Sequence, residues 1–333
     1  MTINYQWLEH QLIENKIDLF RYDAHLRREF WKQLEKKRPE IIAAIIAMNG
    51  MSKRQYDALI EEITMLLAAV YIDFAKTVDA ELLALLYAQG KIQAGLYNEF
   101  LGYQAVKVPS KAAAGEILVA GATMAEWWHK HRDELVFSIG QTVRQYHDAK
   151  VSELKEAVKA NFKQAYARSD TLLRTATARV STQAHADVVS KNTGLVKAIV
   201  FMATLDSRTS QVCRGYDQSK WDLDFKPILG TTLPYKEPPL HPNCRSFLRI
   251  QFLDDVFKLD IEKKRWSEDG DVARDTTYSD WLATKTDAEQ DAILGKGKAK
   301  MWRDGTITMR DMLDQSGNPM TLKELQDKYG VTN

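Results

Sequence analysis

Proline is distributed unevenly along this chain, and its positions limit where long helices can form. Five of the eight prolines lie between residues 227 and 242, whereas the first 226 residues contain only Pro39 and Pro109. Proline removes a backbone donor and clashes with the preceding turn, so it disrupts the interior of a helix. The first two thirds of the chain can therefore form long helices, and residues 227–242 should form an extended or irregular loop.

The apolar spacing before residue 194 is helical. Between residues 55 and 86, apolar side chains recur with the period of one helix face. A second stripe steps by four residues, at Leu154, Val158, Phe162 and Tyr166. Thr123 and Glu126 have the spacing of a capping box, which predicts the start of another helix. Gly194 then marks the end of the helical region, because glycine readily terminates helices.

After Gly194 the pattern becomes that of strands and then returns to short helices. Residues 195–205 are apolar and β-branched, and residues 245–253 alternate polar and apolar side chains. We expect these two segments to pair as antiparallel strands with the proline-rich loop between them. Capping-box patterns at Thr286 and Thr321 predict short helices in the C-terminal tail.

These patterns together predict a mainly α protein with a small α+β module. The expected parts are a helical N-terminal region (1–110), a central helical region (111–192), the α+β module (193–254) and a helical C-terminal tail (255–333).

Charge and cysteine content exclude several classes of protein. The chain carries 46 Lys and Arg against 45 Asp and Glu, which argues against nucleic-acid binding through bulk positive charge. Two cysteines in 333 residues rule out a disulfide scaffold and suit a reducing compartment. The longest apolar runs have eight residues. A membrane span needs roughly 20. We therefore expect an intracellular protein without a membrane partner.

Both cysteines lie near the proline-rich loop, together with a histidine. Cys213 follows the first predicted strand, and His241 precedes Cys244 by three residues. Thiolate and imidazole are zinc ligands, and the His-x2-Cys spacing is compact enough to chelate a metal. A structural zinc site commonly uses two close pairs of ligands. The position that would complete the second pair, three residues before Cys213, is Ser210, a poor ligand.

Four interpretations of Cys213, His241 and Cys244 stay open at this point. We favour two small buried cysteines and a turn-capping histidine with no cofactor, because free cysteine is among the most buried residue types. A zinc site completed by Asp206 or water is the second. A nucleophilic cysteine paired with His241, which Asp206 would orient, is the third. A redox-labile disulfide is the fourth.

Basic side chains gather in the central region. Residues 141–200 contain ten Lys and Arg and five Asp and Glu. Lys155, Lys159 and Lys163 are spaced by four and share one side of a helix. Such a stripe could neutralise the phosphates of DNA. Lysines at this spacing more often form a solvated helix face, and we favour that interpretation.

The chain lacks the common catalytic motifs in a supporting context. It contains no phosphate-binding glycine loop, no H-E-x-x-H and no G-x-S-x-G in such a context. The glycines of residues 295–298 lack the preceding strand of a phosphate-binding loop and are expected at a helix terminus. We therefore expect no enzyme.

The segment from residue 203 to residue 245 resembles the C-terminal signature of the phage Mu F-like minor head proteins, also called phage head morphogenesis proteins. Members of this family commonly read A-x-L-D-x-R-T-C-x-x-C-R, then a proline-rich stretch, then P-P-x-H-P-N-C-R-C. The matching residues here are Ala203, Leu205, Asp206, Arg208, Thr209, Cys213, Arg214, Pro238, Pro239, His241, Pro242, Asn243, Cys244 and Arg245. Residues 174–179, which include Arg174 and Arg179, are similar to a helix that precedes the signature in the family.

The resemblance covers about residues 120–333 and implies a minor capsid or head morphogenesis protein of a tailed phage or prophage. It implies a place in the virion head, and in the host cytoplasm during assembly. The implied partners are the portal protein, other capsid or scaffolding proteins and packaged double-stranded DNA. Two cysteines of the family signature are Ser210 and Ser246 here, so half of any cysteine-based metal set is missing.

Two further hypotheses concern the polar residues of the signature. Asp206, with Arg208 and Thr209 after a strand, suits a turn in which the aspartate accepts hydrogen bonds from backbone donors. Arg174 and Arg179 could extend this turn into a buried network between the long helix and the strand.

Two other functions remain as alternatives. One is a nuclease or transferase module centred on Asp206 and His241. The other is a DNA-binding accessory head protein acting through the stripe at Lys155.

Overall fold

The computed structural model describes six stretches of the chain, which fold into two compact units. The described residues are 5–47, 53–108, 117–146, 149–253, 264–273 and 275–331. The first unit, which we call the sheet unit, comprises Met1–Ile17, Tyr87–Ala113 and Ser181–Asn333. The second, the bundle unit, comprises Asp18–Leu86 and Ala114–Val180. The boundaries expected near residues 110 and 255 lie outside the described residues.

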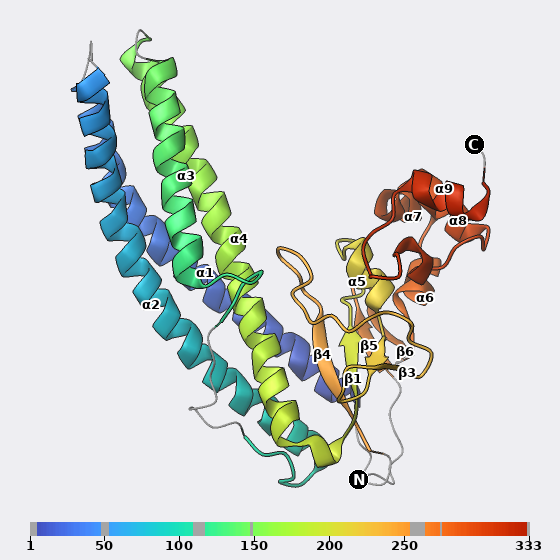
Figure 1. Cartoon of the computed structure of the whole chain (residues 1–333). Coiled ribbons are helices and arrows are strands. Elements are labelled where there is room, and N and C mark those ends of the chain that lie inside the picture. The colour runs from blue at the N-terminus through green and yellow to red at the C-terminus, as the bar shows by residue number, and fades with distance from the viewer. Residues whose placement is uncertain are drawn as a thin grey trace. The chain divides into compact units, whose positions relative to one another are not determined.

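Four long helices dominate the chain before residue 192 (Figure 1). They are α1 (Tyr5–Ile46), α2 (Lys53–Leu101), α3 (Met124–Gln145) and α4 (Val151–Lys191). Pro39 lies inside α1, which continues past it to Ile46. The mainly α prediction is therefore confirmed. Helices α1, α2 and α4 each supply residues to both units.

Aromatic side chains fill the core of the bundle unit. The ring of Phe30 lies 5.0 Å from that of Trp128 and 4.9 Å from that of Phe74, measured between centroids. The helical stripe on α2 also faces inward, with Leu59 and Ile63 fully buried. Burial of such large apolar surfaces is the main source of stability for helices of this kind.

The sheet unit contains the expected strand pair. Strand β1 (Val196–Met202) pairs antiparallel with β4 (Phe247–Phe252), and Ile199 lies opposite Ile250. The other edge of β1 pairs with β2 (Lys220–Trp221), which in turn pairs with β3 (Pro227–Ile228). The sheet therefore has the strand order β3-β2-β1-β4. The short helix α5 (Gln211–Tyr216) follows β1. The sequence patterns did not indicate α5, β2 or β3.

The C-terminal tail is helical as predicted, but it begins with a hairpin that was not predicted. Strands β5 (Lys264–Ser267) and β6 (Gly270–Ala273) pair antiparallel. The helices that follow are α6 (Tyr278–Ala283), α7 (Asp287–Leu294), α8 (Lys296–Arg303) and α9 (Leu322–Tyr329). Gly295 caps the junction of α7 and α8, where a helix terminus was expected.

The three predicted capping boxes are all present. Thr123, Thr286 and Thr321 each accept a hydrogen bond from the backbone of the glutamate three residues later, whose side chain accepts one in return. These reciprocal bonds satisfy backbone donors that a helix leaves unpaired at its start.

The cap of α9 allows a local test. Thr321→Ala should destabilise the helix by about 1 kcal/mol, because the backbone N–H of Glu324 loses its partner, the Thr321 hydroxyl. Hydrogen exchange of the α9 amides should then accelerate about fivefold. Lys323→Ala, at an exposed position of the same helix, is the control and should leave these rates nearly unchanged. Equal rates in the two variants would contradict the role of the cap.

Candidate metal centre

Two sulfurs and an imidazole nitrogen meet in the sheet unit. The Sγ atom of Cys213 lies 3.3 Å from Nε2 of His241 and 3.6 Å from Sγ of Cys244. The three potential ligand atoms all lie within 4.8 Å of one another. Both cysteines are free and 1% exposed, whereas His241 is half-buried. The structure therefore brings together the three residues that the sequence singled out.

The first of these residues is positioned by the start of α5. Ser210 is the N-cap residue, and its hydroxyl accepts a hydrogen bond from the backbone N–H of Cys213 at 3.3 Å. This bond fixes the first turn of the helix and directs Cys213 into the buried core. The serine at the position of the missing cysteine thus has a structural role as a helix cap.

The other two residues come from one tight turn. The backbone N–H of Cys244 donates to the carbonyl of His241 at 3.2 Å, which places both side chains on the same side as Cys213. Asn243 has a φ of 59°, a left-handed conformation that asparagine tolerates better than most residues. Cys244 then leads into β4, so the sheet holds the end of the turn.

One hydrogen bond fixes the tautomer of His241. Its Nδ1 lies 2.8 Å from the carbonyl oxygen of Pro242. A carbonyl can only accept, so Nδ1 carries a proton and donates it. In the neutral ring, Nε2 then presents a lone pair toward Cys213.

The proton balance of the cluster favours one thiolate. A hydrogen bond from Cys213 lowers the pKa of Cys244, and His241 adds to this effect when its ring is protonated. The same bond to Cys244 raises the pKa of Cys213 well above its usual value, with burial acting in the same direction. The thiolate of Cys244 in turn raises the pKa of His241. Cys244 is therefore the sulfur that loses its proton first.

Two serine hydroxyls complete the surroundings of Cys213. Ser210 and Ser246 both lower the pKa of Cys213, against the larger, opposing effects of Cys244 and of burial. Ser246 is buried and directly precedes β4. The two serines that stand where the sequence departs from the signature it resembles therefore both act on Cys213.

Asp206 belongs to a neighbouring turn and not to this cluster. Its carboxylate forms a two-pronged ion pair with Arg245, whose Nη2 lies 2.8 Å from Oδ1. It also accepts from the hydroxyl of Thr209 at 3.1 Å and from the backbone N–H of Arg208 at 3.0 Å. The predicted turn is confirmed. No hydrogen bond joins Asp206 to His241 in the described part of the chain, so Asp206 does not orient His241 as the nucleophile interpretation required.

The arginines of the preceding helix act elsewhere. Arg174 and Arg179 belong to the bundle unit. Burial raises the pKa of the carboxyls of Asp23 and Asp170 there, and the positive charge of Arg174 partly opposes this shift. Asp206 finds its partner in Arg245 instead. The side chain of Arg208 is exposed.

The lysine stripe lies on the exposed face of α4. Lys155, Lys159 and Lys163 are all exposed, and Lys159 forms an ion pair with Glu156. These observations fit a solvated helix face, which needs no ligand.

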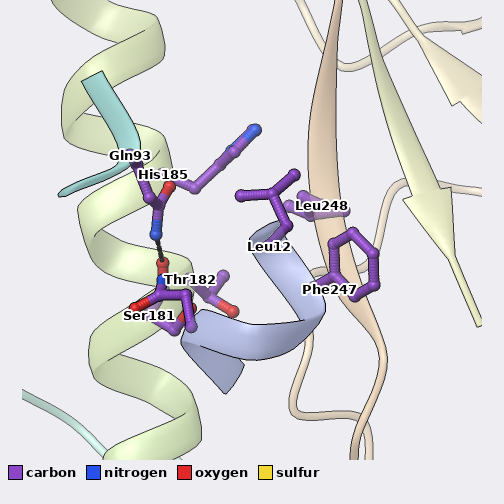
Figure 2. A pocket seen from close by; sticks show the side chains of 8 residues that line it. Leu12, Gln93, Ser181, Thr182, His185, Phe247 and Leu248 are labelled. Carbon is purple, nitrogen blue, oxygen red and sulfur yellow. Dashed lines mark hydrogen bonds between the residues drawn. The ribbon is translucent and has the colours of Figure 1, made fainter. Parts of the chain in front are cut away.

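A second polar cluster in the sheet unit surrounds a small cavity (Figure 2). Gln93 donates to the backbone oxygen of Ser181 at 3.0 Å, and His185 lies next to this pair. The cavity has room for about one water molecule. It is therefore a hydration site at most and not a substrate pocket.

The structure also reveals a buried ion pair that the sequence did not indicate. Asp217, at the end of α5, and Arg265, in β5, are joined at 2.7 Å, with side chains 2% and 4% exposed. Asp217 also accepts from the backbone N–H groups of Ala203 and Tyr278. No local pattern links two residues 48 positions apart, so sequence inspection could not have found this pair.

Comparison with known proteins adds no relative. No family model, curated protein or solved structure matches the chain. Among the described residues, none of the helices has an apolar stretch long enough to cross a bilayer.

Proposed function

We propose that this chain is a minor capsid, or head morphogenesis, protein of a tailed phage or prophage. The observation that carries the proposal is the way in which the distant parts of the signature contact each other. Asp206 pairs with Arg245, and Cys213 contacts both His241 and Cys244. Matches scattered by chance would have no reason to converge in this way. The contacts therefore favour a single structural unit of the kind that the family resemblance implies.

The proposed mechanism is assembly through protein surfaces without turnover. The groups that an enzyme would use are not available to a substrate. Asp206 is paired with Arg245, and both cysteines are buried. The proposed partners are the portal protein and other capsid or scaffolding proteins, in the virion head and in the host cytoplasm during assembly. Packaged DNA is a further proposed neighbour.

An exposed apolar stripe on α2 is the surface that best suits such a contact. Met65, Ile72 and Leu83 are exposed although they are apolar. They are separated by seven and eleven residues, which places them on one face of the helix, with the exposed Lys76 between Ile72 and Leu83. Large apolar side chains exposed on one helix face suit a contact with another protein. We propose that this stripe, in the bundle unit, contacts the portal or capsid.

Particle composition is the direct test of the proposed function. Heads and procapsids purified from the strain that encodes the chain should contain it at a fixed copy number, measured by quantitative mass spectrometry. A variant carrying Met65→Lys, Ile72→Lys and Leu83→Lys should fold but fall at least tenfold in heads, because three charges would have to be desolvated at the contact.

The control for this variant places three lysines on another face of α2. Asp73→Lys, Thr77→Lys and Ala84→Lys are exposed substitutions that should leave incorporation unchanged. Absence of the unmodified chain from both heads and procapsids would overturn the proposed function. Equal loss in the two triple variants would overturn the proposed contact surface alone.

A further inference from the structure

We propose that Cys213, His241 and Cys244 bind one zinc ion, with water in the fourth coordination position. This site goes beyond the proposed function and does not depend on it. Thiolate sulfur and imidazole nitrogen are the ligands that zinc prefers, and two cysteines with one histidine form a known three-residue set that leaves one position open.

The two separations that involve Cys213 are close to those around a tetrahedral zinc. Zinc–sulfur bonds of about 2.3 Å and zinc–nitrogen bonds of about 2.0–2.1 Å place two ligand sulfurs about 3.8 Å apart, and a sulfur and a nitrogen about 3.6 Å apart. The observed separations are 3.6 Å between the sulfurs and 3.3 Å from Cys213 to His241. The third pair, His241 and Cys244, lies within 4.8 Å, and one ion would contact all three atoms once this separation closes to about 3.6 Å.

The surroundings of the ligands also fit the metal. The Nδ1–H group of His241 donates to the carbonyl of Pro242 at 2.8 Å, and metal-bound histidines almost always make such a bond with their other nitrogen. It leaves the lone pair of Nε2 facing the two sulfurs. The nearby carboxylate, that of Asp206, is already paired with Arg245. The site therefore offers soft ligands only, which excludes calcium and magnesium.

Three other interpretations explain less of this geometry. Cysteines that only fill the core would not need a histidine nitrogen directed at them. A nucleophilic cysteine needs access to a substrate, whereas both cysteines are 1% exposed. A disulfide would use the two sulfurs but give His241 no role. In each case, one of the three converging atoms has no function.

The residue at position 246 is the reason that we assign the fourth coordination position to water. Ser246 is buried two residues after Cys244, yet serine is a poor zinc ligand. The half-buried edge at His241 gives water a route to the open position. A cysteine at position 246 would add a thiolate next to the existing ligands. Ser210 is less suitable for this change, because it caps α5.

The experiment measures metal in the purified full chain. Protein expressed with zinc in the medium and desalted under reducing conditions should contain about one zinc per chain by mass spectrometry. Cobalt(II) added to the metal-free protein should produce a thiolate-to-metal charge-transfer absorption band. The His241→Ala variant changes a half-buried loop residue and should still fold, but it should lose at least nine tenths of the bound zinc.

A gain-of-affinity variant keeps the test independent of folding defects. Ser246→Cys should bind zinc at least tenfold more tightly than the unmodified chain in competition with a chelator. Less than a tenth of an equivalent of zinc, with no charge-transfer band on adding cobalt, would overturn the proposal. A Cys213–Cys244 disulfide in protein purified under reducing conditions would also overturn it. None of these measurements involves phage particles, so they can fail while the chain is still found in heads, and the reverse holds as well.

Discussion

Replacing Asp217 by alanine should destabilise the sheet unit by about 3–5 kcal/mol, because Arg265 would remain buried without its counter-charge. Both side chains are almost completely buried, and the shorter of their two contacts measures 2.7 Å. An unpaired guanidinium in such a place has neither water nor a carboxylate to solvate it. This is one of the largest single-residue effects that we expect in the described part of the chain.

The size of the effect follows from how many elements the pair connects. Asp217 accepts hydrogen bonds from the backbone of Ala203, after β1, and of Tyr278, at the start of α6. Arg265 donates to the backbone oxygens of Ala203 and Thr276. Loss of the carboxylate would therefore leave two backbone donors unsatisfied in addition to the charge.

Equilibrium urea unfolding measures this effect, and the chain offers a matched control. Asp224 and Lys226 form an ion pair at 3.7 Å in which both side chains are largely exposed. Asp224→Ala should cost less than about 0.5 kcal/mol, since exposed pairs contribute little. If Asp217→Ala lowered the free energy of unfolding by no more than the control, the buried pair would have no special role in the fold.

The elements that could be predicted from the sequence are those with a local physical cause. A threonine three residues before a glutamate carries all the groups of a capping box, and all three predicted boxes are present. The strands β1 and β4 were found because their apolar and alternating patterns run for six or seven residues. Such signals need no knowledge of the rest of the fold.

The elements that were missed are too short to carry a periodic pattern. Strands β2 and β3 have two residues each, and α5 has six. They are held by tertiary contacts, such as the hydrogen bond from Trp221 to the backbone of Leu233 at 2.9 Å. Propensity over so few residues cannot outweigh such contacts.

The candidate site lies between these two cases. The His-x2-Cys spacing shows in the sequence that His241 and Cys244 can approach one atom. That Cys213 joins them depends on β1, α5 and the turn before β4, which only the fold brings together. The sequence also marked Ser210 as a poor ligand, but only the structure shows that it caps α5.

Deleting residues 1–110 would not test the N-terminal region alone, because α1 and α2 also supply residues to the sheet unit. Leu12 of α1 and Ala94 and Tyr97 of α2 are part of the core cluster that contains β1 and β4. The Tyr97 hydroxyl accepts a hydrogen bond from the backbone of Ile250 at 3.1 Å. Removing residues 1–110 would take these side chains from the sheet unit. Surface substitutions are therefore the informative way to examine the contacts of α2.

Lowering the pH from 7 to 4.5 should weaken the sheet unit by about 2–3 kcal/mol through His185 alone. Burial lowers the pKa of His185 from 6.5 to about 4, and its Nε2 has no hydrogen-bond partner among the described residues. Between these two values the unfolded chain takes up a proton on this histidine and the folded chain does not. The resulting stability is complete above pH 6.5 and is lost as the pH falls toward 4.

His185→Leu should remove this dependence, because leucine cannot titrate and the cavity beside it is lined by Leu12 and Leu248. Urea unfolding at pH 7 and pH 4.5 gives the loss for each protein, and the unmodified chain should lose about 2–3 kcal/mol more than the variant. If His185→Leu and the unmodified chain lost equal stability, the histidine would be protonated in the folded protein, and its cavity would have to hold the water that solvates the charge.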